Sequence, residues 1–184
     1  KTINLGMMYG MGVNKLSEQM DISVEDAKVL IKQYHNKVPF VKMLMSGVTT
    51  RLNEKDSSGS IRSILGRKCR FDLWEPTTFA MHKALPYRDA IKEHGDTTRL
   101  RRAYTYKALN RLIQASAADM TKQAMVNIYE TGKIPLIQIH DEIALSVKDI
   151  KEAKKYSTIM ENAVPLVIPS KCDVEVGASW GEAK

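Results

Sequence analysis

The stretch from Ile134 to Val147, IPLIQIHDEIALSV, constrains the fold of this chain more than any other. Two apolar runs, Leu136–Ile139 and Ile143–Val147, flank the triplet His140-Asp141-Glu142, and a Gly-Lys-Ile-Pro segment precedes them. Short runs rich in Ile, Leu and Val on both sides of polar residues predict two strands joined by a very tight turn. We therefore expect a hairpin that holds two adjacent carboxylates at its tip.

Two adjacent carboxylates raise the free energy of such a turn unless a cation or hydrogen bonds offset their charge. A divalent metal ion would suit Asp141 and Glu142, because hard cations bind carboxylate oxygens. The alternative is an ordinary hairpin with a polar turn, since polar turns between apolar strands are common. The triplet by itself leaves both interpretations open.

Length and charge set broad limits on the protein. The 184 residues, 43% of them hydrophobic, suffice for one sizeable core, or for one domain and part of another. The chain begins at Lys1 and not at Met, so we interpret it as a piece of a longer chain. No apolar run approaches the ~20 residues of a membrane span, and the two cysteines form no framework, which favours a cytoplasmic protein without a membrane partner. The net charge of +7 suits a polyanionic partner, although many soluble proteins are as basic.

The pattern of apolar and breaking residues divides the chain near residues 53–60 into a helical part and a mixed part. In the first part we expect helices over residues 1–19 with a break at Gly10 and Gly12, from Asp21 to about Asn36, and from Phe40 to about Leu52. In the second part we expect a hairpin over Ser60–Phe71, an irregular stretch over Asp72–Asp96, a helix over Thr98–Glu130, the hairpin around His140, and a helix over Lys151–Ala163.

Two helical stripes carry further chemistry. Lys1, Leu5 and Tyr9 recur every four residues, so a helix would place them on one face. There the lysine could bind a phosphate, and the other two side chains could pack against a sugar and a base. Gly6 and Gly10 would leave room beside them for such a ligand. The alternative is an amphipathic helix end. In the long predicted helix, the second stripe is formed by Tyr106, Asn110 and Gln114. Amides suit the acceptors that every base pair presents in the minor groove, although an exposed polar face would look the same.

Four segments, in order, resemble family A DNA polymerases, the bacterial polymerase I type. KTINLGMMYG resembles the fingers-helix motif of that family, and NRLIQASAADMTKQAM resembles its palm helix. His140-Asp141-Glu142 is similar to the carboxylate motif of the palm, and VPLVIPSKCDVEVGASWGEAK resembles the C-terminus of phage members. The matches span nearly the whole chain, and they indicate a phage or viral member of the family.

The resemblance implies an α/β (α+β) fold that is part of the polymerase right hand. Residues 1–56 would form the C-terminal part of the fingers subdomain, and residues 57–184 the C-terminal part of the palm, with antiparallel strands and a long helix. It implies template-directed nucleotidyl transfer in DNA replication with two Mg²⁺ ions. Asp141 would be a ligand of this metal pair, and Glu142 would stand beside it in a supporting role.

The resemblance also assigns partners to individual residues. Lys1 would contact the triphosphate of the incoming dNTP and protonate the pyrophosphate, and Tyr9 would lie against the templating pair. Leu5 would pack against the nucleotide sugar, where the family commonly has Phe or Tyr and some viral members have Leu. The primer–template DNA would be contacted in its minor groove by Asn110, Gln114 and His140, and along its backbone by Arg67 and Arg70.

The family's other metal-binding aspartate lies in a strand that this chain does not contain. We therefore expect the isolated chain to be inactive, and to require the N-terminal part of the polymerase, either covalently joined or as a separate subunit. The alternative is a DNA-binding remnant without chemistry. A metal-dependent nuclease is disfavoured, because Asp141 and Glu142 lack the additional carboxylates that such a site needs.

Overall fold

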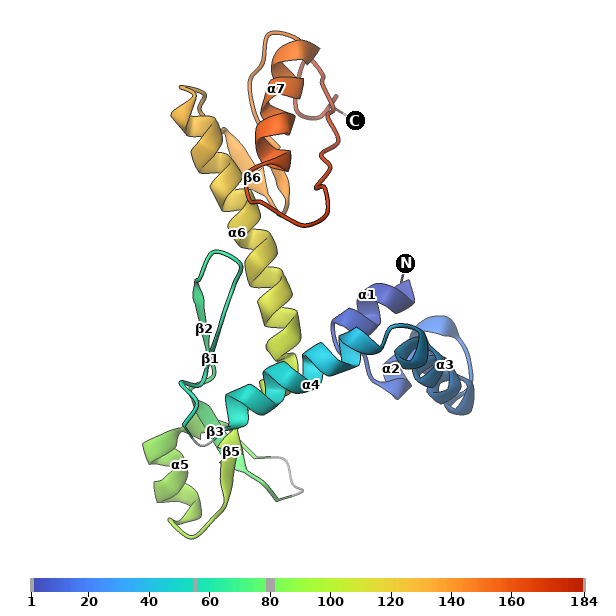
Figure 1. Ribbon diagram of the computed structural model, residues 1–184, viewed down its shortest axis with the longest axis vertical. Helices are drawn as coiled ribbons and strands as arrows, with labels where there is room; N and C mark the ends of the chain where they lie inside the picture. Colours follow the sequence, from blue (N-terminus) through green and yellow to red (C-terminus); the bar gives the residue numbers. More distant parts are fainter. Residues whose placement is uncertain (1, 55, 79–81, 184) are drawn as a thin grey trace. The chain divides into compact units, whose positions relative to one another are not determined.

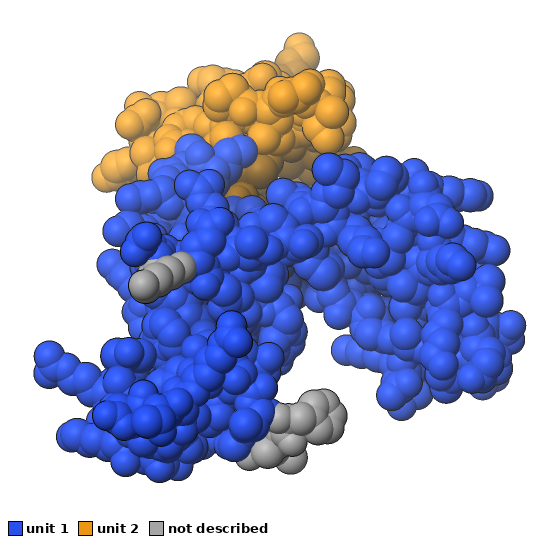
Figure 2. All heavy atoms as spheres, turned by 60° about the horizontal axis from the view of Figure 1, so that its bottom comes forward, with its two compact units in different colours: residues 1–113 blue, residues 114–184 orange. Residues whose placement is uncertain are grey.

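The computed structural model describes residues 2–54, 56–78 and 82–183 (Figure 1). The chain forms two compact units, one up to residue 113 and one from residue 114, coloured separately in Figure 2. The division falls inside the helix α6 (Ala108–Glu130). It is a division by contacts, so the expected boundary between fingers and palm, at residues 56 and 57, stays a prediction.

The first unit opens with four helices, α1 (Thr2–Met8), α2 (Val13–Met20), α3 (Val24–Lys37) and α4 (Pro39–Asn53). Helix α1 ends before Gly10, which has a φ of +76°. Glycine adopts such a positive φ without strain. Ser23 caps α3 by accepting a hydrogen bond from the backbone N–H of Asp26, at 3.0 Å. Pro39 occupies the first turn of α4, where its missing N–H costs nothing. The predicted helices are confirmed, with the first one divided in two at the glycines.

The strands of the first unit form two antiparallel sheets. Strands β1 (Ser60–Arg62) and β2 (Lys68–Arg70) pair as the predicted hairpin, with Ile61 opposite Cys69. A three-stranded sheet follows in the order β4 (Leu85–Pro86), β3 (Leu73–Pro76) and β5 (Leu100–Arg102), and α5 (Tyr87–His94) lies between β4 and β5 in the chain.

This sheet overturns two of the predictions. The described residues between 72 and 96 are not irregular throughout, because they contain β3, β4 and α5. Residues 98–107 are not part of the α-helix, because they contain β5 and then a short 3-10 helix (Thr105–Lys107) before α6 begins. The physical reason is cross-strand pairing: Arg101 Nη2 lies 2.9 Å from a carboxylate oxygen of Glu75 on the neighbouring strand. Such tertiary contacts override the local helix propensity of arginine.

The core of the first unit joins three of these elements. Leu52 of α4, Phe71 after β2 and Ala108 at the start of α6 are at most 3% exposed and form one cluster. Val48 and Ile61 pack against this cluster. The base of the β1–β2 hairpin is therefore anchored in the same core cluster as the start of α6.

The second unit contains the rest of α6, the strands β6 (Ile137–Ile139) and β7 (Glu142–Ala144), and α7 (Ile150–Glu161). The predicted hairpin and the last helix are confirmed. Ile128 of α6 and Tyr156 of α7 are buried, whereas every residue of β6 is exposed. Among the described residues, none of the helices combines the length and the apolar character that crossing a bilayer requires.

Glu152 fixes the start of α7 through three neighbours. Its carboxylate accepts a hydrogen bond from the backbone N–H of Lys148 (2.7 Å), pairs with Nζ of Lys133 (2.9 Å) and accepts from the hydroxyl of Tyr156 (3.3 Å). These contacts, led by the backbone N–H of Lys148, lower the pKa of Glu152 from 4.5 to about 2.

We expect the unfolding free energy of Glu152→Gln to fall less steeply than that of the parent as the pH is lowered below 4.5. Because the folded pKa lies below the unfolded one, the unfolded state binds more protons as pH falls from 4.5 to about 2. The stability that the carboxylate contributes is therefore complete above pH 4.5 and is lost through that window. Urea unfolding at a series of pH values measures this, with Glu130→Gln, at an exposed position of the same unit, as the control. Parallel curves for Glu152→Gln and the parent would contradict it.

Candidate nucleotide and nucleic-acid site

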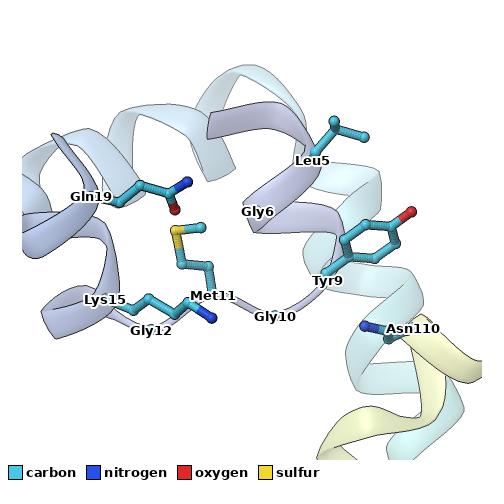
Figure 3. Close-up of a pocket in the computed structure, with 9 residues that line it drawn as sticks. All are labelled: Leu5, Gly6, Tyr9, Gly10, Met11, Gly12, Lys15, Gln19 and Asn110. Carbon is cyan, nitrogen blue, oxygen red and sulfur yellow. The ribbon is translucent and has the colours of Figure 1, made fainter. Parts of the chain in front are cut away.

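Leu5, Tyr9 and Asn110 line one cavity of the first unit, with a volume of about 590 Å³ (Figure 3). Leu5 of α1 and Tyr9, the residue after its end, point to the same side, and they are 45% and 39% exposed. Asn110 comes from the first turn of α6 and is half-buried. The fold thus brings together two of the predicted nucleotide-contacting residues and one of the predicted DNA-contacting residues.

The glycines of α1 place a methionine beside the cavity. A Cβ atom at Gly6 would lie 2.3 Å from Cε of Met11, so only glycine lets this side chain lie against α1. The backbone N–H of Met11 also donates to the carbonyl oxygen of Gly6, at 2.8 Å. Gly6 and Gly10 both line the cavity, as expected, and Met11 occupies part of the room beside Gly6.

Two residues of α2 that the sequence analysis did not single out also line the cavity. Lys15 and Gln19 are exposed and stand four residues apart on α2, so they lie on one face of that helix. Lys15 adds a cation to the lining of the cavity, on the side that α2 forms, across from Leu5 and Tyr9 (Figure 3). Their four-residue spacing places them on one helix face, but it does not indicate that this face lies at the cavity. Lys1, the predicted triphosphate contact, lies outside the described residues.

The second predicted stripe is only partly helical. Asn110 and Gln114 are four residues apart on α6, as expected, and Gln114 belongs to the second unit. Tyr106 lies before α6 in the 3-10 helix and is 65% exposed, with Nζ of Lys107 5.5 Å from its ring centroid. The prediction that Tyr106 continues the stripe on the same α-helix is therefore wrong.

The carboxylate turn of the second unit has the predicted geometry. Ile139 pairs with Glu142 across the hairpin, so His140 and Asp141 are the two residues of the turn. His140 has a φ of +53°, and its carbonyl oxygen accepts a hydrogen bond from the side-chain amide of Gln138. His140, Asp141 and Glu142 are all exposed. The turn thus presents two neighbouring carboxylates to solvent on a short, closed hairpin.

Cys172 lies within the electrostatic reach of the turn, because the charge of Asp141 acts on its thiol. Burial, together with the charges of Glu161, Asp173 and Asp141, raises the pKa of the half-buried Cys172 thiol. Carboxylate oxygens are the ligands that Mg²⁺ prefers, so Asp141 and Glu142 suit such an ion. Within the described ranges, however, no group of three or more His, Cys, Asp or Glu side chains could hold a metal. The turn therefore fits one part of a Mg²⁺ ligand set.

Arg67 and Arg70 lie on the β1–β2 hairpin of the first unit, and both are exposed. The carbonyl oxygen of Arg70 accepts a hydrogen bond from Nη1 of Arg111, at 3.3 Å, which ties β2 to the start of α6. The side chain of Arg111 in turn covers the ring of Phe71, at 4.8 Å from the ring centroid. The two arginines thus stand on an anchored element, and their contact with a DNA backbone stays a prediction.

The family model for DNA polymerase family A matches residues 1–182. The chain belongs to this family. A DNA-directed DNA polymerase of Pseudomonas phage M6 is 38% identical over 158 residues, which cover 86% of this chain and 20% of that protein. The thermostable DNA polymerase I of Thermus filiformis is 31% identical over 191 residues, which cover 100% of this chain and 20% of that protein.

A solved structure is similar to this fold over 99% of the chain and 30% of the solved chain. It is the POL domain of Pol1 from M. smegmatis in complex with DNA primer-template and dNTP, with a TM-score of 0.73 and 29% sequence identity. The predicted fold class, mixed helices and antiparallel strands of a family A polymerase, is confirmed. The chain spans about a fifth of the length of the curated relatives that it matches.

Proposed function

We propose that this chain is the C-terminal portion of a DNA-directed DNA polymerase, which extends a primer by template-directed nucleotidyl transfer in DNA replication. The observation that carries the proposal is the cavity in which Leu5, Tyr9 and Asn110 meet, in a chain that matches family A over residues 1–182. The two helices that supply these residues are far apart in the sequence. Their convergence supports a site for an incoming dNTP beside the primer–template minor groove.

Different residues of the chain contact different parts of the nucleotide and the DNA. Lys1 contacts the triphosphate, Leu5 the sugar and Tyr9 the templating pair. Asn110, Gln114 and His140 donate to minor-groove acceptors that are common to all base pairs, so they test the shape of a pair without reading its sequence. Arg67 and Arg70 hold backbone phosphates, and these contacts make binding salt-dependent.

Family A DNA polymerases use divalent metal ions, generally Mg²⁺. Asp141 and Glu142 are the residues of this chain that would hold such an ion, Asp141 as the direct ligand. When bound, such ions would supply Lewis-acid activation of the primer hydroxyl and charge neutralisation at the leaving pyrophosphate. Because Asp141 and Glu142 supply only part of the ligand set, the remaining carboxylate comes from the N-terminal part of the polymerase.

The exposed hairpin β6–β7 supports the need for this partner. Ile137 and Ile139, on one face of β6, are 44% and 37% exposed, and Leu136, just before the strand, is 62% exposed. A two-stranded sheet is marginally stable alone, and exposed apolar strands of this kind pair with or pack against further chain. We assign this surface to the rest of the polymerase, in the cytoplasm of a phage-infected bacterial host.

Primer extension tests the proposal directly. The purified chain, given primer–template DNA, dNTPs and Mg²⁺, is expected to add no nucleotides. Addition of an upstream polymerase fragment that carries the missing aspartate strand should restore extension. Extension by the chain alone would contradict the incomplete ligand set. DNA binding without extension, even in the presence of the upstream fragment, would favour a remnant that binds DNA without chemistry.

Leu5→Phe is expected to change how the polymerase selects nucleotides. An aromatic ring at this edge of the cavity packs against the sugar over a larger area than leucine does. The kcat/KM ratio between a dNTP and its 3′-deoxy analogue should therefore shift by about threefold to tenfold, because one aromatic contact contributes about 1 kcal/mol. Leu5→Met, which keeps an apolar side chain of similar size without a ring, is the control. An unchanged ratio in Leu5→Phe would contradict this role.

A further inference from the structure

The tip of the β1–β2 hairpin carries an exposed apolar pair. Ile64 and Leu65 stand between the two strands and are 44% and 48% exposed. Ile61, on the strand below, packs against the core of the first unit. The hairpin thus uses one apolar residue to anchor its base and leaves two others partly exposed at its end. Figure 1 shows it extending away from the β3–β5 sheet.

Hydrogen bonds fix the shape of this tip. The backbone N–H of Ser63 donates to the carbonyl oxygen of Arg67 (2.9 Å), and the N–H of Gly66 donates to the carbonyl oxygen of Ser63 (2.9 Å). The hydroxyl of the buried Ser63 accepts from the N–H of Arg67, at 3.0 Å. Nη1 of Arg62 donates to the carbonyl oxygen of Gly66, at 2.7 Å. A tip ordered in this way loses little conformational entropy when a partner binds.

The charge around the tip identifies the chemistry of the partner. Residues 60–70 contain four cations and no carboxylate. The cations are Arg62, Arg67, Lys68 and Arg70, and all four are exposed. Cations around an apolar pair are complementary to a polyanion that has apolar surfaces between its negative charges. DNA has this structure, because flat base faces are stacked between two lines of phosphates.

We propose that Ile64 and Leu65 form an apolar wedge that contacts the faces of DNA bases, while the four cations of the hairpin hold the neighbouring phosphates. Isoleucine and leucine are among the side chains that proteins insert between base steps, where they partly unstack them. The inference rests on the proposed function for the presence of DNA. It adds a contact with base faces, which the phosphate contacts of Arg67 and Arg70 do not provide.

The test uses the full chain and a primer–template DNA that carries 2-aminopurine at successive duplex positions. Binding is followed by anisotropy, and unstacking by the rise in 2-aminopurine fluorescence. We expect the parent chain to raise the fluorescence at one cluster of positions. The double variant Ile64→Ser, Leu65→Ser should lose this rise and bind about threefold to tenfold more weakly, with an unchanged salt slope because no cation is removed.

Two control variants separate the wedge from general effects. Phe40→Ser, Met43→Ser removes a more exposed apolar pair of α4, 60% and 71% exposed, and should leave both signals unchanged. Lys68→Gln, Arg70→Gln should lower the salt slope by about one per lost phosphate contact and keep the fluorescence rise at saturating protein. Circular dichroism shows that each variant is folded, and all six side chains are exposed.

Three outcomes would overturn the wedge. They are an absence of DNA binding by the parent, a fluorescence rise that survives in Ile64→Ser, Leu65→Ser, and loss in that variant of binding to phosphatidylserine vesicles but not to DNA. Failure of the wedge leaves primer extension by the reassembled polymerase intact. Failure of the proposed function instead abolishes extension while the fluorescence rise remains, so the two failures are distinguishable.

Discussion

Asp141→Asn is expected to abolish nucleotide addition by the polymerase that contains this chain, with kcat lowered by at least about 1,000-fold. Asparagine keeps the size of the side chain and one oxygen, but it removes the negative charge that a hard cation requires. Asp141 is exposed in the two-residue turn between β6 and β7, so the substitution leaves the hairpin pairing in place. The loss should therefore appear in catalysis and not in the unfolding free energy.

Single-turnover primer extension at several Mg²⁺ concentrations measures this effect. Asp173→Asn is the matched control, because Asp173 is also exposed and also contributes negative charge near Cys172. It should retain the activity of the parent. Glu142→Gln is expected to have a smaller effect than Asp141→Asn, since Glu142 supports the site from the first residue of β7. Activity of Asp141→Asn within tenfold of the parent would show that another residue is the ligand.

The sequence predicts best those elements whose cause is local. Ser23 marks the start of α3 because a serine hydroxyl satisfies a backbone N–H that the helix leaves open. The β6–β7 turn is predictable because apolar runs stop on both sides of His140-Asp141. Strand β5 could not be predicted in this way. Its partners Trp74 and Glu75 are more than 20 residues away in the sequence, and nothing local favours a strand over a helix.

The candidate site shows the same limit. Helical spacing alone suggested that Leu5 and Tyr9 share a face, but it could not place Asn110 beside them. The family resemblance supplied that link. Met11, Lys15 and Gln19 were missed because their place at the cavity depends on the reversal of the chain at Gly10, which brings α2 next to α1. The direction of a chain after a glycine turn is a tertiary property, which spacing does not encode.

Arg102 of β5 holds together the segments that flank the β1–β2 hairpin. Its guanidinium donates to the carbonyl oxygens of Phe71 (3.0 Å) and Ser57 (3.3 Å). It also lies over the ring of Trp74, at 4.5 Å from the ring centroid. Gly59, buried and at a φ of +61°, leaves room for it, since a Cβ atom there would lie 2.4 Å from Cζ of the arginine. One side chain thus fixes both ends of the hairpin.

Arg102→Ala is expected to lower the free energy of unfolding by about 2–4 kcal/mol, because it removes two charge-assisted hydrogen bonds and a cation–π contact. Arg102→Lys should recover only part of this loss, since an ammonium cannot reach two carbonyls and stack on indole at once. Gly59→Ala should also destabilise this contact, because alanine is strained at the positive φ of residue 59 and its Cβ atom would clash with the guanidinium of Arg102. Urea unfolding followed by tryptophan fluorescence measures all three.

The control is Arg99→Ala, which removes an exposed arginine next to the same strand and should change the unfolding free energy by less than about 0.5 kcal/mol. A loss in Arg102→Ala no larger than this would show that the hairpin is fixed by its core contacts at Ile61 and Phe71 alone. The expected loss of stability should also reduce base unstacking in bound DNA. Because Arg102 joins both ends of the hairpin to β3 and β5, loosening it should weaken base unstacking by Ile64 and Leu65 even though neither side chain is changed.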